Sequence, residues 1–416
     1  MQYLTQSASE DILLFEGQMS LTPGDQGEPI TAEGRVWFKW EPSPRPYFGL
    51  HSNDAQLIFG REEATVVLHP DEVQLATSNV AIGGAGEFPV HGTIERVSLG
   101  DAESPLASVM FHVTNFTNYA GGSLSFDVGE WRITITPASG ITSLIAELRY
   151  RGGFGITHIG KIERQDGGVF VADDVTGLLS FLFLLLSFAR GLWTGPILPL
   201  GIGANGQVVW QSWGSWKLGR WRGMPTWFDE LIPNALGAIA PEFWRRWEDP
   251  QWHRPLQTLV SSLVETNTTP STEVRLLIIQ TTLELLSWML LVETQQVHNR
   301  RKFDKLSAAD KIRALLSHYD VGYAIPQELA ALSSLTSARR YKDGPDACTQ
   351  LRNGLVHPHE KGRRRVETLL VQEKFEAAQL LHWFAEVVFL KDLGYSGKYG
   401  NRLRLPRWSG DLDDLP

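Results

Sequence analysis

Three side chains suited to phosphodiester chemistry lie within six residues in the last quarter of this 416-residue chain: Arg352, Asn353 and His357. Arginine carries a planar, permanently charged fork that matches phosphate oxygens, and an imidazole with an ordinary pKa of about 6.5 exchanges protons near neutral pH. If the segment is helical, Asn353 and His357 share one face, and Arg352 reaches sideways on its long stem. The spacing therefore favours cleavage of a phosphodiester bond.

A helical frame is expected around these residues. Ser271 can open a helix that runs through the apolar stretch containing Glu284, and residues 302–319 predict a further helix with one apolar face. Pro345 or Asp346 begins the helix that carries the motif.

Pro358 bars regular continuation of that helix, because proline lacks a backbone N–H. A long helix is predicted over residues 366–393. The tail after residue 393 is expected to be irregular and peripheral.

The motif and its frame resemble the HEPN superfamily of helical ribonucleases and toxins, in which an Arg and a polar residue precede a His five positions after the Arg. The resemblance covers roughly the last third of the chain. It implies that Arg352, Asn353 and His357 form a catalytic site at a homodimer interface. It also implies that RNA is cut without a metal or other cofactor, by activation of the ribose 2′-hydroxyl. Glu284 is a candidate to orient Arg352 or His357.

An alternative interpretation stays open, in which the region is a non-catalytic HEPN module for dimerisation or ligand binding. Arg352 and His357 would then cap helix carbonyls and complement the helix dipole. No metal-ligand motif or glycine-rich phosphate loop of convincing spacing accompanies the motif, so neither a metal nor a cofactor is predicted.

Charge is distributed unevenly along the chain, whose formal net charge is −9. From His298 onward 20 basic residues face 15 acidic ones, a balance of +5, so the preceding part carries −14. Basic clusters on both sides of the motif are candidates to hold an RNA backbone, although such runs are also typical of solvated loops. The candidate RNA-binding residues are Arg339, Arg340, Lys361, Arg363, Arg364 and Arg365.

Residues 1–165 are predicted to be rich in antiparallel strands, as a sandwich or an open barrel. Segments 35–40, 64–68, 109–113 and 131–136 are apolar or alternating and lie between turn-forming residues. His112, on the third of these segments, is expected to be a packing residue.

Residues 166–270 contain an apolar segment, 175–193, and tryptophans at positions 193, 210, 213, 216, 221 and 227. The segment is interpreted as a buried helix rather than a membrane span, because its length is marginal for crossing a bilayer. The tryptophans are interpreted as core residues, with base stacking or partner binding as the alternative.

Together these features predict an α+β protein with three parts: a β-rich region (1–165), an irregular Trp-rich region with a buried helix (166–270) and a HEPN-like helical bundle (271–416). The single cysteine, Cys348, excludes an internal disulfide and is expected to be a packing residue. Neither a secretory signal nor a membrane anchor is expected, so the predicted location is cytoplasmic.

A β-rich front joined to this helical region resembles abortive-infection proteins of the ApeA type. That resemblance implies antiviral RNA cleavage, with the front region sensing a phage-derived trigger or restraining the nuclease.

Overall fold

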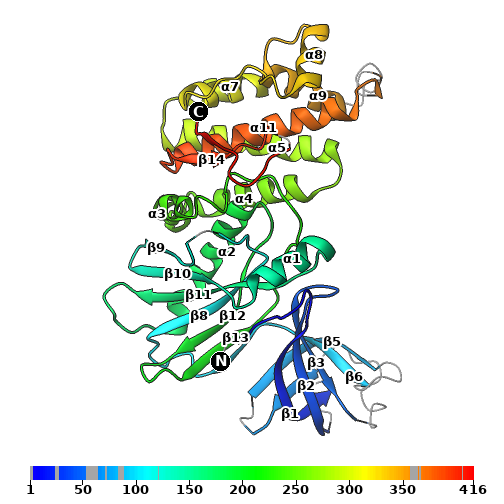
Figure 1. Cartoon of the computed structure of the whole chain (residues 1–416), viewed down its shortest axis with the longest axis vertical. Coiled ribbons are helices and arrows are strands. Elements are labelled where there is room, and N and C mark those ends of the chain that lie inside the picture. The colour runs from blue at the N-terminus through cyan, green and yellow to red at the C-terminus, as the bar shows by residue number, and fades with distance from the viewer. Residues whose placement is uncertain are drawn as a thin grey trace. The chain divides into compact units, whose positions relative to one another are not determined.

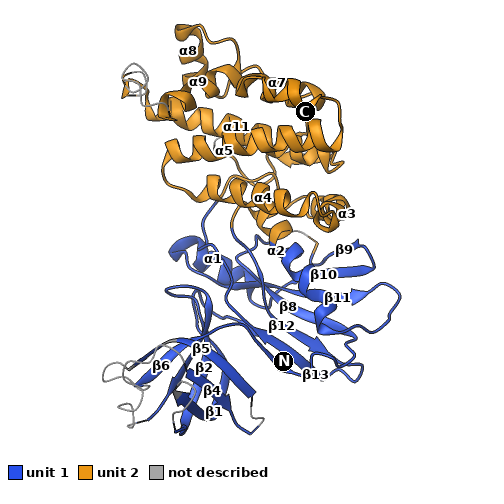
Figure 2. Cartoon of the chain, turned by 180° about the vertical axis from the view of Figure 1, so that it is seen from behind, with its two compact units in different colours: residues 1–118, 122–183, 193–223 blue, residues 119–121, 184–192, 224–416 orange. Residues whose placement is uncertain are grey.

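The computed structural model describes residues 3–23, 28–52, 64–70, 73–82, 89–119, 121–356, 364, 367–404 and 406–416. Its contacts divide the chain into two compact units (Figure 2). Unit 1 comprises residues 1–118, 122–183 and 193–223, and unit 2 comprises residues 119–121, 184–192 and 224–416. Antiparallel strands dominate the N-terminal region and helices dominate the C-terminal region, so the predicted α+β class is confirmed.

Six strands of unit 1 close into a barrel in the order β1-β2-β3-β6-β5-β4. They are β1 (Ile12–Pro23), β2 (Ile30–Lys39), β3 (Arg45–Leu50), β4 (Ala64–Leu68), β5 (Val73–Ile82) and β6 (Val90–Ile94). The predicted strands at 35–40 and 64–68 correspond to β2 and β4. The barrel is closed rather than open, because β1 pairs along one edge with β2 and along the other with β4. Closure leaves no free strand edge.

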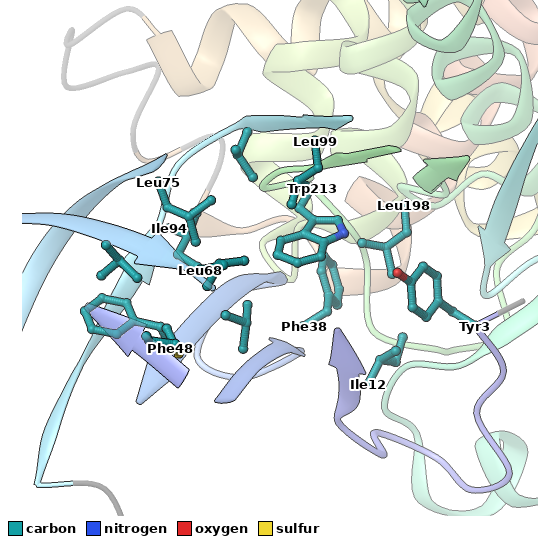
Figure 3. Close-up of a cluster of buried hydrophobic side chains, with 14 of the residues drawn as sticks. Tyr3, Ile12, Phe38, Phe48, Leu68, Leu75, Ile94, Leu99, Leu198 and Trp213 are labelled. Atoms are coloured by element: carbon teal, nitrogen blue, oxygen red, sulfur yellow. The ribbon is translucent and has the colours of Figure 1, made fainter. Parts of the chain in front are cut away.

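The barrel interior is filled by apolar side chains, of which Val36, Phe38 and Leu75 have at most 1% of their surface exposed. Figure 3 shows Phe38, Leu75 and Ile94 in one cluster that also includes Trp213. Alternate residues of β2 point inward, which explains the alternating pattern of its sequence.

The remaining strands of unit 1 form a seven-stranded antiparallel sheet in the order β7-β13-β12-β8-β11-β10-β9. They are β7 (Val97–Gly100), β8 (Ser108–Thr114), β9 (Leu124–Val128), β10 (Trp131–Pro137), β11 (Ile156–Arg164), β12 (Pro196–Ile202) and β13 (Val208–Trp213), and helix α1 spans Ile141–Arg151. The predictions at 109–113 and 131–136 correspond to β8 and β10.

His112 lies on β8 and is fully buried, as predicted. Its Nε2 accepts a hydrogen bond from the backbone N–H of Tyr3 at 3.0 Å, and its Nδ1 lies 3.1 Å from the carbonyl oxygen of Leu198. Both ring nitrogens are therefore used in packing the sheet.

The Trp-rich region contributes regular elements as well as irregular chain. Strands β12 and β13 join the sheet, and Trp210 and Trp213 on β13 are both buried. Trp193, Trp221 and Trp227 are buried too, which supports the interpretation of these tryptophans as core residues.

Helix α2 (Thr176–Arg190) follows a 3-10 turn, η3 (Ala172–Val175), and is largely buried, as predicted. It ends at Gly191, whose φ of 65° lies in the left-handed region that glycine adopts without strain. The segments Ala172–Arg190 and Thr272–Thr294 are long and apolar enough to cross a membrane. In these segments 67% and 56% of the most apolar stretch, respectively, is buried inside the protein, as in core helices.

Unit 2 is a helical bundle (Figure 1). Its elements are α3 (Asn234–Glu248), α4 (His253–Thr268), α5 (Thr272–Trp288), the π-helical turn η4 (Met289–Thr294), α6 (Arg300–Asp304), α7 (Ala308–His318), α8 (Ala330–Arg339), α9 (Gly344–Val356), α11 (Val371–Asp392), β14 (Lys398–Gly400) and β15 (Leu412–Asp414). Helix α11 packs against α4, α5, α7, α8 and α9. Because it is surrounded, its sequence is apolar on nearly every face from Ala377 to Leu390.

Two details of unit 2 differ from expectation. The single helix predicted over 302–319 is two helices, because Ser307 caps a new one: its Oγ accepts from the backbone N–H of Asp310 at 3.2 Å. The tail is not peripheral, since β14 pairs with β15 and Arg402 is buried.

Candidate functional site

Helix α9 carries Arg352 and Asn353, and its first turn is firmly held. The carboxylate of Asp343 accepts a hydrogen bond from the backbone N–H of Asp346 at 3.0 Å. It accepts two more from Nε and Nη2 of Arg313, at 2.6 and 2.9 Å. Cys348 is fully buried, with its Sγ 3.6 Å from the carbonyl oxygen of Ala377 in α11. Burial raises the pKa of this thiol, so Cys348 is a packing residue, as predicted.

Arg352 occupies the last turns of α9 and is half-buried. Its Nη1 donates to Oδ1 of Asn353 at 3.4 Å, which is a long hydrogen bond. Its Nε is buried and has no hydrogen-bond partner among the residues that the structure describes. Within the described part of the chain, Arg352 forms no salt bridge.

Three other arginines of unit 2 that are buried or half-buried have carboxylate partners. Arg246 pairs with Asp392 at 2.9 Å, Arg313 with Asp343 at 2.6 Å and Arg402 with Glu386 at 2.9 Å. A buried cation is costly unless it is paired. No described carboxylate of unit 2 neutralises the guanidinium of Arg352. A positive charge in that state can hold an anion.

The structure does not bring Glu284 and Arg352 into an ion pair, considering the residues that it describes. Glu284 is half-buried on α5, and its Oε1 accepts from Nε2 of Gln280 at 3.3 Å. Helices α5 and α9 are packed against each other, so the two side chains belong to neighbouring elements.

His357 lies outside the described residues, as do Lys361, Arg363 and Arg365. Of the other candidate RNA-binding residues, Arg339 ends α8 and donates from Nη2 to Oγ1 of Thr368 at 3.1 Å. Arg340 and Arg364 are exposed. Arg340 is the left-handed C-cap of α8, with φ of 56°. Among the residues that the structure describes, no group of three or more His, Cys, Asp and Glu side chains could hold a metal ion.

A polar cluster inside unit 2 was missed from the sequence. Gln379, His382 and Glu386 lie on one face of α11, each with at most 8% of its surface exposed. Their spacing of three and four residues within an otherwise apolar helix was the available signal. Arg402 from the tail completes the cluster.

These features define the class of the protein: an α+β chain in which a barrel and an antiparallel sheet form one unit and a helical bundle forms the other. Residues 101–224 match the family model described as the YopA central domain, and residues 249–413 match the one described as the YopA C-terminal domain.

The chain is similar to the SPbeta prophage-derived uncharacterized protein YopA of Bacillus subtilis (strain 168). The two are 26% identical over 436 residues, an alignment that covers all of this chain and 97% of the relative. A comparison with solved structures finds no match.

Proposed function

We propose that this protein is a metal-independent endoribonuclease of the HEPN type. The observation that carries the proposal is the state of Arg352, a half-buried guanidinium at the end of α9 without a carboxylate partner among the described residues. Adjacent in sequence are Asn353 and, four residues further, His357. This set suits phosphate binding and proton transfer.

In the proposed reaction the ribose 2′-oxygen attacks the neighbouring phosphorus, and the bond from phosphorus to the 5′-oxygen breaks. His357 exchanges the proton of the attacking hydroxyl or of the leaving oxygen. Arg352 stabilises the charge that develops on the phosphate, and Asn353 orients His357 or the substrate. The products are a 2′,3′-cyclic phosphate and a free 5′-hydroxyl.

We propose that two copies of the chain form the site together. Apolar side chains flank the motif segment in sequence: Val356 is 44% exposed, Leu370 63% and Val371 72%. A contiguous patch of exposed apolar side chains is typical of an interaction surface, and we propose that these three side chains belong to one. A homodimer in which they are covered would place two motifs close to one RNA strand, with the basic residues beside the motif holding the backbone.

The biological role that we propose is antiviral abortive infection in the cytoplasm, with the barrel and sheet of unit 1 sensing a phage-derived trigger or restraining the nuclease. The similar Bacillus protein is prophage-derived by name, which supports a role in encounters between phages and bacteria. Plaque counts in cells expressing the wild type and His357→Ala test this role. Equal protection by both would contradict it.

The biochemical test is cleavage of total RNA by purified wild type, Arg352→Ala and His357→Ala, with analysis of the fragment ends. We expect 2′,3′-cyclic phosphate ends with the wild type, retained activity in EDTA, and a loss of about 10²-fold or more in either variant. Arg301→Ala is a matched control, because Arg301 is exposed on α6, away in sequence from the motif. Equal cleavage by all four proteins would refute the proposal. RNA binding without cleavage would favour the non-catalytic module.

A further inference from the structure

Unit 2 contains a cavity of about 190 Å³ between α4, α5, α11 and the chain at residues 224–225. Met224, Phe375 and Ala378 give it an apolar wall. Gln379, His382 and the guanidinium groups of Arg275 and Arg402 give it a polar one. Neither Arg352 nor Asn353 is among the residues that line it.

Arg402 forms a fixed part of the cavity wall. Its Nε and Nη2 donate to the two carboxylate oxygens of Glu386 at 2.9 and 3.0 Å. Its Nη1 donates to Oε1 of Gln379 at 3.1 Å and to Oδ1 of Asn267 at 3.3 Å. The bond to Arg402 fixes the oxygen of the Gln379 amide. The other end of this amide, Nε2, can therefore donate to a different acceptor.

Two buried polar groups of the wall lack partners within the described part of the chain. Gln379 is 8% exposed, and its Nε2 has no acceptor among the described residues. His382 is 2% exposed, and neither of its ring nitrogens forms a hydrogen bond with a described residue. None of these nitrogens is among the described side-chain atoms that are sealed from solvent without a partner, so they can meet an acceptor group inside the cavity.

The charge of the described wall residues indicates the sign of such a group. The lining residues include two arginines, Arg275 and Arg402, and no acidic residue, and the Glu386 carboxylate behind the wall offsets the charge of Arg402. Burial, and then the proximity of Arg402 and Arg275, lower the pKa of His382 well below its usual value. The imidazole is therefore neutral at pH 7 and can still donate one N–H.

We propose that this cavity binds a small monocarboxylate with an apolar body of about the size of benzoate. The carboxylate would accept from Gln379 Nε2 and the His382 N–H and lie in the field of the guanidinium groups. The apolar body would pack on Phe375, Ala378 and Met224. Ligand pockets commonly combine apolar walls with a few convergent polar groups in this way.

Calorimetric titration of the full-length protein with benzoate, benzamide and inorganic phosphate tests the proposal. We expect benzoate to bind with a submillimolar Kd and to raise the Tm. Benzamide has the same shape but no charge, so it should bind at least about tenfold more weakly, as charge-assisted hydrogen bonds are the stronger ones. No heat at about 10 mM benzoate, equal affinity for the two aromatic probes, or binding of phosphate alone would overturn the proposal.

Variants and a spectroscopic probe locate the ligand. Arg275→Gln should weaken benzoate binding about tenfold, whereas Arg301→Gln, the same change at an exposed site, should leave it unchanged. Ala378→Leu should abolish binding by filling the cavity. If Ala378→Leu fails to fold, the imidazole ¹⁵N resonances of His382 in the wild type still decide: a shift on adding benzoate supports the site, and no shift at saturation overturns it.

Discussion

The guanidinium of Arg402 and the carboxylate of Glu386 form a two-pronged ion pair in the interior of unit 2, with N–O distances of 2.9 and 3.0 Å. Neither side chain has more than 4% of its surface exposed. The pair joins the tail of the chain to the central helix α11, so a segment that follows the last long helix is part of the core.

Breaking this pair should strongly destabilise the bundle. We expect Arg402→Met or Glu386→Gln to lower the free energy of unfolding by about 3–5 kcal/mol, because either leaves a buried group without its partner. The double variant Arg402→Met with Glu386→Gln should cost less than the sum of the two single changes. Urea denaturation measures all three, and a loss below about 1 kcal/mol in both single variants would contradict the buried geometry.

The burial of Arg402 could not be predicted from the sequence, because its partners Glu386, Gln379 and Asn267 are 16 to 135 residues away along the chain. A tail rich in arginine and aspartate has the composition of a solvated segment, and composition does not reveal long-range pairing. The helical spacing of the polar residues on α11 was visible in the sequence. Their partner, Arg402 in the tail, was not.

Local signals were more informative than long-range ones. The predicted strand at 64–68 coincides with β4, and the predicted start of α5 agrees with the N-cap at Ser271, because alternation and capping are written in neighbouring residues. Closure of the barrel depends on pairing between β1 and β4, which are more than 40 residues apart. The pattern of apolar residues within each strand does not specify that pairing. That no described carboxylate pairs with Arg352 depends on long-range packing, which local sequence does not specify.

The break between α6 and α7 gives a prediction about capping. Ser307 Oγ accepts from the backbone N–H of Asp310 at 3.2 Å and lies 2.7 Å from Oδ2 of the same residue. Ser307→Ala should therefore cost about 1 kcal/mol of unfolding free energy. The control is Ser337→Ala, which removes only a bond to the carbonyl oxygen of Ser333 within α8 and should cost less than about 0.5 kcal/mol. Equal losses would show that Ser307 is not acting as a cap.

His112 predicts a pH dependence for the sheet of unit 1. Burial lowers its pKa from 6.5 to about 4. Because the unfolded chain takes up the proton first, the neutral imidazole contributes full stability above pH 6.5, and this contribution is lost as the pH falls from 6.5 to about 4. The loss amounts to about 3 kcal/mol.

The matched variant for this pH dependence is His112→Gln, whose amide can accept from the backbone N–H of Tyr3 and donate to the carbonyl oxygen of Leu198 without titrating. We expect unfolding free energies measured between pH 7 and pH 4 to fall less steeply in the variant than in the wild type. His158, whose pKa burial lowers to about 3, titrates in both proteins and cancels in the comparison. Parallel curves would refute the assignment to His112.

Arg352 allows stability and activity to be separated. Its Nε is buried without a partner in the described ranges of the chain, and its contact with Asn353 is long. The described hydrogen bonds of this side chain therefore contribute little to the fold. Arg352→Met keeps the length and removes the buried N–H, and it should change the free energy of unfolding by less than about 1 kcal/mol in either direction.

The same variant should lose RNA cleavage by about 10²-fold or more, and Arg352→Lys should recover only part, because an ammonium lacks the planar fork that fits phosphate. Denaturation curves and cleavage rates on the same preparations test both expectations. A variant that is strongly destabilised yet cleaves normally when folded would assign Arg352 to the architecture of α9 instead of to the reaction, because a residue that binds phosphate must affect turnover even where the fold does not need it.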